Sequence, residues 1–346
     1  MQTRVVSLGE LLPQVGAFLA STELTIDVYT MNPQLTPIVA YVVPVFNQED
    51  QIAHCLESLV ACATLPAELV IVVDGSTDGT ASAVERWIEA TVERLDTELV
   101  KVIVARALTS VFETMSDTIG VALSTAPYII EVQADMTMDH PAFDQLMTSW
   151  LGNTDDVLAV SGRGAHSFSY AGLSPRTGIL SHFRRFFSRA NSFARKNSDS
   201  YSPNAFEYFL SDSIGRVGIA VDRNAPIGGP KRLYLHETVM RGPLAIRRDM
   251  LERLGGLDTR SFFLGNDDHD LSMRAWNDLG LRVGYTPVRF DSPIDIGSTR
   301  RMRTANEQIE FNSLKERFET AALASALVIG ASTYKAPPRK ILTEKA

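Results

Sequence analysis

Short apolar runs alternate with amphipathic segments over the first half of the chain. The runs at 38–43, 69–73, 99–105 and 128–132 are rich in β-branched residues and predict buried strands. The segments between them carry apolar residues at helical spacing. Because strands that are apolar along their whole length are covered on both faces, the pattern predicts an α/β fold with a mostly parallel sheet flanked by helices.

The same pattern divides the chain into parts. Residues 1–37 are expected to be an N-terminal extension with a short amphipathic helix around Leu8 to Leu19, and residues 38–290 the main domain. Periodicity fades between 162 and 230, and a loop of this length is either functional or disordered. Residues 291–346 form a tail with a predicted helix from 305 to 327.

Composition narrows the class of protein. The 346 residues are 45% hydrophobic, which suffices for a large core, and a net charge of -8 argues against a general nucleic-acid binder. No window approaches the ~20 apolar residues of a membrane-spanning helix. Cys55 and Cys62 are interpreted as small buried hydrophobes in a reducing compartment. We therefore expect a cytoplasmic protein, soluble or peripheral to a membrane.

Acidic residues stand at the ends of two predicted strands. Asp135 follows the run at 128–132, and Asp74 ends the run at 69–73. Ligands of open α/β sheets bind beyond the carboxyl ends of strands, where a lone carboxylate suits a divalent cation that takes its other ligands from phosphates. Asp74 opens a turn of small residues that a base or ribose can approach closely. The structural alternative is that both carboxylates only set turns or cap helices.

A third acidic segment lies later in the chain. Asp267, Asp268 and Asp270 cluster at the start of a predicted helix. A helix N-terminus favours negative charge, but capping requires only one of the three. Neighbouring carboxylates raise the pKa of one member, which suits a general base.

Four motifs in this order resemble those of GT-A-fold nucleotide-sugar glycosyltransferases, and in particular the large inverting family 2. The matching segments are Pro44-Val-Phe-Asn-Gln-Glu49, Val73-Asp-Gly-Ser-Thr-Asp-Gly-Thr80, the segment from Gln133 to Asp135, and Gly255-Gly-Leu-Asp258 followed by Asp267-Asp-His-Asp-Leu-Ser-Met-Arg274. Each motif alone is weak, but four in the right order are strong. The resemblance spans about residues 38–290.

The resemblance implies a function and a site. A sugar would move from a nucleoside-diphosphate donor to an acceptor hydroxyl of a glycan or lipid-linked molecule, with inversion, in polysaccharide or glycan synthesis. Asp268, beside Asp267, would be the catalytic base, and Asp135 would hold Mn²⁺ or Mg²⁺ on the diphosphate. The residues expected to bind the nucleotide sugar are Pro44, Phe46, Asn47, Glu49, Asp74, Gly75, Gln133, Ala134 and Arg300.

The chain departs from the family pattern at several points. Gln133 replaces the first acid of the metal motif, where it would contact ribose or a metal-bound water, and this change predicts weaker metal binding. Glu113 and Asp117 stand where the family commonly has Asn and small residues. The spacing between Asp135 and Asp268 exceeds that of the family, so 162–230 is interpreted as an insertion on the acceptor side.

Three further features carry two interpretations each. The basic and aromatic stretch 182–196 is either a packed or acceptor-binding helix or an interfacial helix that contacts a membrane. Arg300 and Arg301 either close over the diphosphate or form a solvated turn. His236 and His269 are interpreted as hydrogen-bonding residues rather than metal ligands.

Other functions fit less well. A sugar nucleotidyltransferase would carry a basic, Gly-rich loop after the first strand, and 44–49 has no Lys, Arg or Gly. A phosphatase of the Asp-x-Asp-Gly-Thr type is rejected because Ser76 stands at its nucleophile position. A non-catalytic nucleotide-sugar-binding protein is favoured by Gln133 and opposed by the Asp267–Asp268 pair. The sequence does not define the oligomeric state.

Overall fold

The structure is a computed structural model that describes residues 1–92, 98–166, 231–236, 238–260, 262–265, 267–292, 308–309, 311–313, 316 and 340–343. The predicted insertion lies outside these residues from 167 onward, and so does most of the tail helix expected at 305–327. Among the described residues, no helix has the length and apolar character needed to cross a membrane.

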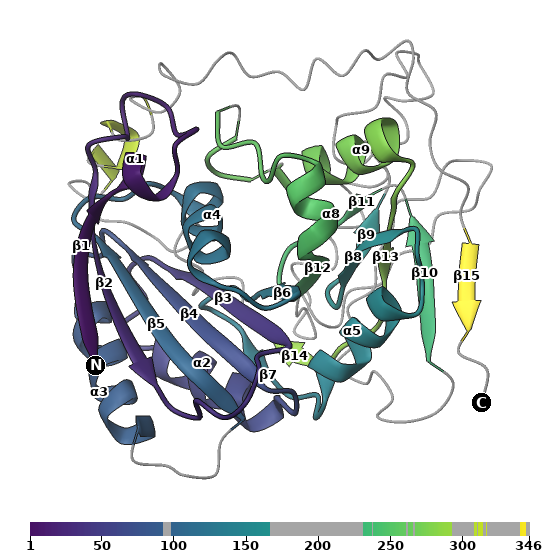
Figure 1. Ribbon diagram of the computed structural model, residues 1–346, viewed down its shortest axis with the longest axis horizontal. Coiled ribbons are helices and arrows are strands. Elements are labelled where there is room, and N and C mark those ends of the chain that lie inside the picture. Colours follow the sequence, from purple (N-terminus) through teal and green to yellow (C-terminus); the bar gives the residue numbers. More distant parts are fainter. Residues whose placement is uncertain are drawn as a thin grey trace.

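A large mixed sheet organises the described part of the chain, in the order β1-β2-β5-β4-β3-β6-β12-β8-β13-β10-β15 (Figure 1). Its strands are β1 (Gln2–Ser7), β2 (Glu23–Thr30), β3 (Val39–Val45), β4 (Ala67–Asp74), β5 (Leu99–Ala107), β6 (Tyr128–Glu131), β8 (Val157–Ser161), β10 (Arg232–His236), β12 (Leu244–Arg247), β13 (Arg282–Tyr285) and β15 (Lys340–Thr343). Two short pairs accompany it, β7 (Thr137–Met138) with β14 (Phe290–Asp291) and β9 (Ala165–His166) with β11 (Thr238–Val239).

The four strands predicted from apolar runs form the parallel centre of this sheet. Strands β5, β4, β3 and β6 are parallel neighbours, and β4 is buried along its whole length. The flanks differ, because β1, β2, β10, β12 and β15 all pair antiparallel. The α/β class is confirmed, and its parallel character belongs to the centre and to the β8–β13 pair.

Residues 2–30, expected as an extension, join the sheet. Strand β2 pairs antiparallel with β5, and β1 pairs with β2. The helix expected from Leu8 to Leu19 is limited to α1 (Leu8–Leu11), whose N-cap is Ser7. The side chains of Leu24 and Ile26 are fully buried, so this hairpin contributes to the core.

Helices cover both faces of the sheet, as Figure 1 shows. The helices α2 (Ile52–Cys62), α3 (Thr80–Val92) and α5 (Phe143–Gly152) pack on one face, and α1, α4 (Glu113–Leu123), α8 (Arg248–Arg253) and α9 (Asp267–Leu279) on the other. Adjacent residues of one strand serve opposite faces: Tyr41 and Val43 contact the first helical layer and Val42 the second.

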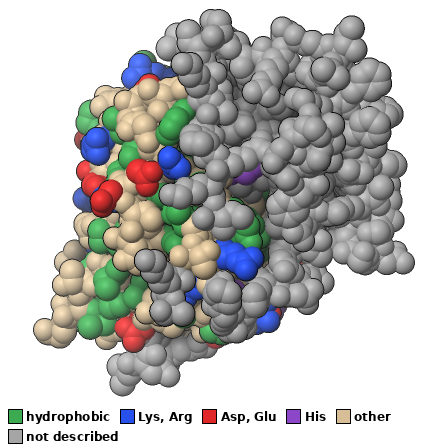
Figure 2. Space-filling model, turned by 90° about the vertical axis from the view of Figure 1, so that its right-hand side faces the viewer, with side chains coloured by type: hydrophobic (Ala, Val, Ile, Leu, Met, Phe, Trp, Pro, Cys, Tyr) green, Lys and Arg blue, Asp and Glu red, His purple; other side chains and the backbone are tan. Residues whose placement is uncertain are grey.

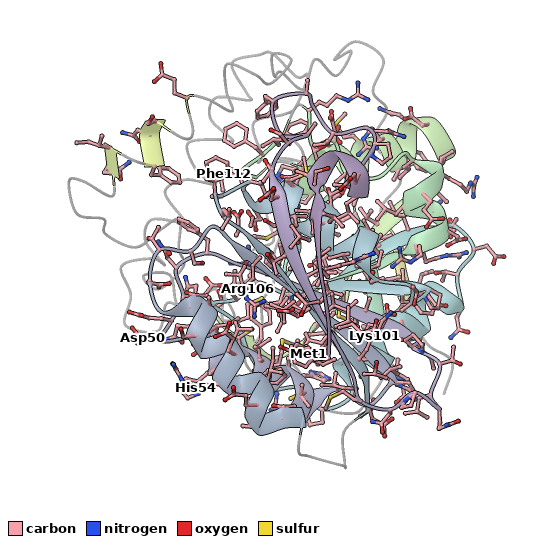
Figure 3. The ribbon with its side chains drawn as sticks, turned by 60° about the vertical axis from the view of Figure 1, so that its left-hand side comes forward. Met1, Asp50, His54, Lys101, Arg106 and Phe112 are labelled. Atoms are coloured by element: carbon pink, nitrogen blue, oxygen red, sulfur yellow. The ribbon has the colours of Figure 1, made fainter. Side chains whose placement is uncertain are left out.

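Helix α2 illustrates how the pattern of burial follows the sequence. Cys55 and Cys62 are buried on it as predicted, and burial raises the pKa of the Cys55 thiol to about 12. Its other side is exposed, with His54 pointing away from the sheet and Asp50 just before the helix (Figure 3). On the described part of the face in Figure 2, acidic and basic side chains are interspersed with hydrophobic ones.

Candidate functional site

Three predicted loops meet at the carboxyl edge of the parallel strands. The register pairs Val45 with Val73 across β3 and β4, and Val42 with Glu131 across β3 and β6. The segments that follow, 44–49, 74–80 and 132–136, therefore leave the sheet side by side. This edge is where open α/β sheets bind ligands.

The first two loops are joined by side-chain hydrogen bonds. The amide of Asn47 accepts from the Thr77 backbone N–H at 2.7 Å, and the Glu49 carboxylate accepts from the Gly79 N–H at 2.7 Å. The Thr80 hydroxyl accepts from the Gln48 N–H at 2.8 Å. The side chains of Asn47 and Glu49 thus hold the second loop in place, and their predicted contacts with the donor stay a prediction.

Asp74 organises the loop after β5. Its carboxylate accepts hydrogen bonds from the Ser110 hydroxyl and the Val111 N–H, both at 2.6 Å, and from the Phe112 N–H at 3.0 Å. Burial raises the pKa of Asp74 to about 6, although these hydrogen bonds act to lower it. The carboxylate therefore faces the backbone at 110–112, which it holds at the start of α4.

Gly75 allows this loop to approach. Its φ is 57°, and a Cβ there would lie 2.2 Å from the backbone nitrogen of Ser110. Phe112, labelled in Figure 3, also has a positive φ, at 67°. A packed loop after β5 thus accounts for both Asp74 and Gly75, and a direct contact of either with a nucleoside stays a prediction.

Beyond β6, Asp135 and Gln133 have different surroundings. Asp135 is buried, and its charge adds to the raised pKa of the Cys55 thiol, which burial chiefly causes. The Gln133 amide donates to Glu113 Oε1 at 3.2 Å and accepts from the Arg163 guanidinium at 2.6 Å. Gln133 thus connects the end of β6 to α4 and to the segment after β8, and Ala134 is buried beside it.

A cation at Asp135 would rely on its substrate for most ligands. Within the described residues, no group of three or more His, Cys, Asp or Glu side chains is arranged to hold a metal ion. One hard carboxylate fits Mg²⁺ or Mn²⁺, which bind through one or two carboxylates plus phosphate oxygens and water. The donor set is thus compatible with the predicted metal.

The three acids of the first turn of α9 have distinct partners. Asp267 is fully buried and forms an ion pair with Arg241. Asp270 pairs with Arg274 at 2.7 Å, and Arg274 also donates to the carbonyls of Leu254 and Gly256. Asp268 keeps 14% of its side-chain surface exposed, and among the described residues it has no arginine partner.

His269 is a hydrogen-bonding residue, as expected. Its Nδ1 lies 2.8 Å from the Thr238 hydroxyl and 3.3 Å from Asp268 Oδ1, and the side chain is buried. His236 is buried on β10. Metal contact by either histidine is not tested by these contacts.

A buried charge cluster was missed by the sequence analysis. Arg241, 8% exposed, forms ion pairs with Asp117, Asp267 and, at 3.4 Å, Glu113. Glu131 lies within the field of the same guanidinium, and neither of its oxygens has a hydrogen-bond partner among the described residues. The available signal was a charged residue inside an apolar run, as Glu131 is within 128–132 and Arg241 between Val239 and Pro243.

The cluster contains more acids than one arginine neutralises. Burial raises the pKa of Glu131 to about 7; Arg241 opposes the shift, and Glu113 and Asp268 add to it. Burial also raises the pKa of Asp117 well above its usual range, despite the neighbouring guanidinium. Burial thus favours the protonated form of Glu131.

Aromatic packing connects the two halves of the site. The rings of Phe112 and Phe263 lie 5.2 Å apart, and the Thr114 N–H donates to the Phe263 carbonyl at 3.3 Å. Phe311 of the tail packs edge-on against Phe112 at 6.0 Å. The loop held by Asp74 thus contacts the segment just before α9. Arg300, Arg301 and the stretch 182–196 lie outside the described residues.

The fold and this site define a class: an α/β protein with carboxylates at the strand ends and an acidic first turn in a later helix. Residues 41–207, just under half of the chain, match the family model described as glycosyl transferase family 2. The match confirms the resemblance carried by the motifs. Over residues 41–207 the chain is thus similar to glycosyl transferases of family 2, and this match supports glycosyltransferase activity.

Several solved structures are similar to this chain at low identity. A mannosyltransferase from Pyrobaculum calidifontis, in complex with GDP-Man and Mn²⁺, is 19% identical with a TM-score of 0.49, over 90% of this chain and 69% of that chain. Glucosyl-3-phosphoglycerate synthase from Mycobacterium tuberculosis, with Mn²⁺ and UDP-Glc, is 13% identical with a TM-score of 0.42, over 84% and 81%. S. aureus TarS 1–349 with UDP-GlcNAc is 14% identical with a TM-score of 0.41, over 83% and 68%. No curated protein matches the sequence significantly.

Proposed function

We propose that the protein is an inverting glycosyltransferase that moves a sugar from a nucleoside-diphosphate donor to an acceptor hydroxyl, with a divalent cation. The observation that carries the proposal is the division of roles in the first turn of α9. Asp267 and Asp270 are each held by an arginine, whereas Asp268 is partly exposed and available as a base. Its segment packs on the loop at the carboxyl edge of β4 and β5.

In this mechanism Asp268 accepts the proton of the acceptor hydroxyl. The oxygen attacks the anomeric carbon from the face opposite the diphosphate, the bond to the diphosphate oxygen breaks, and the configuration inverts. The edge formed by 44–49 and 74–75 would hold the nucleoside, with Pro44 and Phe46 partly exposed there. Gln133 and Ala134 would lie along the donor, and Arg300 would close over the diphosphate.

Asp135 would hold Mn²⁺ or Mg²⁺. Such an ion supplies positive charge to the diphosphate, which makes a general acid unnecessary. The proposal extends to glycan or lipid-linked acceptors, a cytoplasmic location, and membrane contact through 182–196 as the alternative to packing.

Release of nucleoside diphosphate from a panel of nucleotide sugars tests the proposal, with the Asp268→Asn variant beside the wild type. We expect Asp268→Asn to abolish transfer and to change donor affinity by only a few-fold, because the amide keeps the shape and loses the basicity. Asp278→Asn, an exposed position of the same helix, is the control and should retain activity. Normal turnover by Asp268→Asn would remove the base assignment.

The same assay separates the alternative. A non-catalytic nucleotide-sugar-binding protein is favoured by Gln133, which is an amide where the family has an acid. This amide is already hydrogen-bonded to Glu113 and Arg163. A wild-type protein that binds nucleotide sugars and releases no nucleoside diphosphate with any acceptor tested would support this function instead.

Metal dependence is tested at Asp135. The Asp135→Ala variant should lose the gain in donor affinity that Mn²⁺ gives the wild type, because its carboxylate is the proposed ligand. Titration calorimetry with and without Mn²⁺ measures this gain. Asp139→Ala, four residues later and exposed, is the control that should keep it. An Mn²⁺ response in Asp135→Ala equal to that of the wild type would contradict the assignment.

A further inference from the structure

Arg241 joins three elements that carry the proposed site. Its guanidinium pairs with Glu113 and Asp117 on α4 and with Asp267 at the start of α9. Its pKa rises through the charges of Asp117, Glu131, Glu113 and Asp268, against the opposing effect of burial. Glu131 belongs to β6, the strand that leads to Asp135.

A continuous chain of contacts runs from this arginine to the end of β6. Glu113 Oε1 lies 3.4 Å from Arg241 and accepts a hydrogen bond from the Gln133 amide at 3.2 Å. Gln133 is two residues before Asp135. The turn at Gly242 lies against the same residue, since a Cβ at 242 would be 3.0 Å from Gln133 Cγ. One buried cation thus bridges the two sides on which the proposed base and the proposed metal ligand stand.

The first turn of α9 depends on this bridge. Asp267 is fully buried and its described ion pair is with Arg241, and Asp268 is the next residue. Removing one partner of a buried ion pair leaves an uncompensated charge and is strongly destabilising locally. Without Arg241, the carboxylates of Asp117, Asp267 and Glu113 would repel one another, and the helix start would move away from α4.

We infer that Arg241 is a positioning residue for the transfer reaction: it fixes the start of α9 against α4 and β6, and so sets where Asp268 stands relative to the donor. The inference rests on the proposed function for its kinetic consequence. Its structural consequence, the order of the first turn of α9, is independent of any activity. Lysine cannot replace arginine fully, because an ammonium group does not reach three carboxylates in a planar fork.

Arg248 provides a matched control. It is a partly buried arginine at the start of α8 that also contacts α4, but its guanidinium donates to the carbonyls of Ala126 and Val121 and to the Ser124 hydroxyl. Its described contacts include none with the first turn of α9. Loss of Arg248 should lower stability and leave the proposed base in place.

The test compares Arg241→Met and Arg241→Lys with Arg248→Met. We expect Arg241→Met to lower kcat by about 100-fold with a change in donor KM of about threefold or less, since small misplacements of reacting groups cost this much. Arg241→Lys should fall between it and the wild type, and it is the variant to measure if Arg241→Met does not fold. Arg248→Met should keep kcat within about threefold at a matched loss of melting temperature.

Amide hydrogen exchange gives the second readout. Exchange at residues 267–273 should accelerate in the Arg241 variants and not in Arg248→Met. Equal kcat values for the Arg241 and Arg248 variants at matched stability, or unchanged exchange in 267–273, would overturn the inference. A wild type without transferase activity whose Arg241 variants still show faster exchange there would instead refute the proposed function and keep only the structural consequence, the ordering of the first turn of α9 by Arg241.

Discussion

Glu131 is a carboxyl group in the interior of a sheet strand, and its ionisation controls part of the stability of the site. It lies on β6 beside Arg241, and burial raises its pKa from the usual 4.5 to about 7. Since the folded state binds this proton more tightly than the unfolded chain, the stability that this group contributes is fully present below pH 4.5 and is lost as the pH rises through about 7. At higher pH the ionised carboxylate adds to an acidic excess.

Replacement of Glu131 by Gln should therefore have an effect that depends on pH. We expect Glu131→Gln to melt close to the wild type near pH 5 and above it near pH 8, because the amide resembles the protonated acid and never ionises. Glu68→Gln is the opposing control: although burial raises the pKa of Glu68, bonds from Lys101, Thr125 and Ala126 lower it overall. That carboxylate stabilises the fold above its usual pKa, so its loss should cost stability at pH 8. Melting curves between pH 5 and 8 measure both, and a Glu131→Gln variant that follows the pH dependence of the wild type would contradict the assignment.

At the same scale, the sequence predicted which residues belong to the site better than it predicted which residues they contact. The acids at 74, 135 and 267–270 were found from the sequence because each ends an apolar run or begins a helix. Their hydrogen-bond partners were not found, because Asp74 bonds to residues 36 to 38 positions away in the sequence. Asp117 and Arg241 of the buried charge cluster are likewise 124 positions apart. Periodicity reports the burial of a residue and carries no signal for such pairings.

Between elements, the turn at Gly75 lies close against the loop after β5. Gly75 has a positive φ, and a Cβ there would lie only 2.2 Å from the Ser110 nitrogen, so both features exclude a side chain. Gly280, at the end of α9, has a similar φ of 66° with open space around it. A substitution at Gly280 therefore tests the effect of the positive φ alone, and one at Gly75 tests the positive φ together with close packing.

We expect Gly280→Ala to lose about 1–2 kcal/mol of unfolding free energy, the cost of a left-handed conformation with a Cβ. Gly75→Ala should lose more, by roughly 1–3 kcal/mol, because the methyl group also displaces the backbone at 110–112 from Asp74. Chemical denaturation measures both values. Equal losses would mean that the loop after β5 moves aside at no cost.

Strands and helices were predicted well where the pattern was strong. The bounds of the four predicted strands, 38–43, 69–73, 99–105 and 128–132, match those of β3, β4, β5 and β6 within two residues. The prediction failed at the N-terminus, where a helix to Leu19 was expected and α1 ends at Leu11. Strand β2 lies in the same part of the chain, and it was not recognised because its apolar residues alternate with polar ones and form no continuous apolar run.

Across the whole molecule, antiparallel strands extend the parallel centre on both sides. Strand β2 closes the β5 edge, where Arg106, labelled in Figure 3, forms an ion pair with Asp27. On the other side, β12 runs antiparallel between β6 and β8 and brings Arg241, just before it, next to the end of β6. The pairing of β12 thus places the charge cluster at the site.

The sequence by itself determined the α/β class, the four central strands, and the acidic positions at their ends, because these depend on local periodicity and on the chemistry of single residues. Only the tertiary structure decided which groups those acids meet: Asp74 the loop at 110–112, Asp267 the buried Arg241, and Gln133 the carboxylate of Glu113. The physical reason is that burial and electrostatic pairing depend on distances in space, which the pairing of strands far apart in the chain sets.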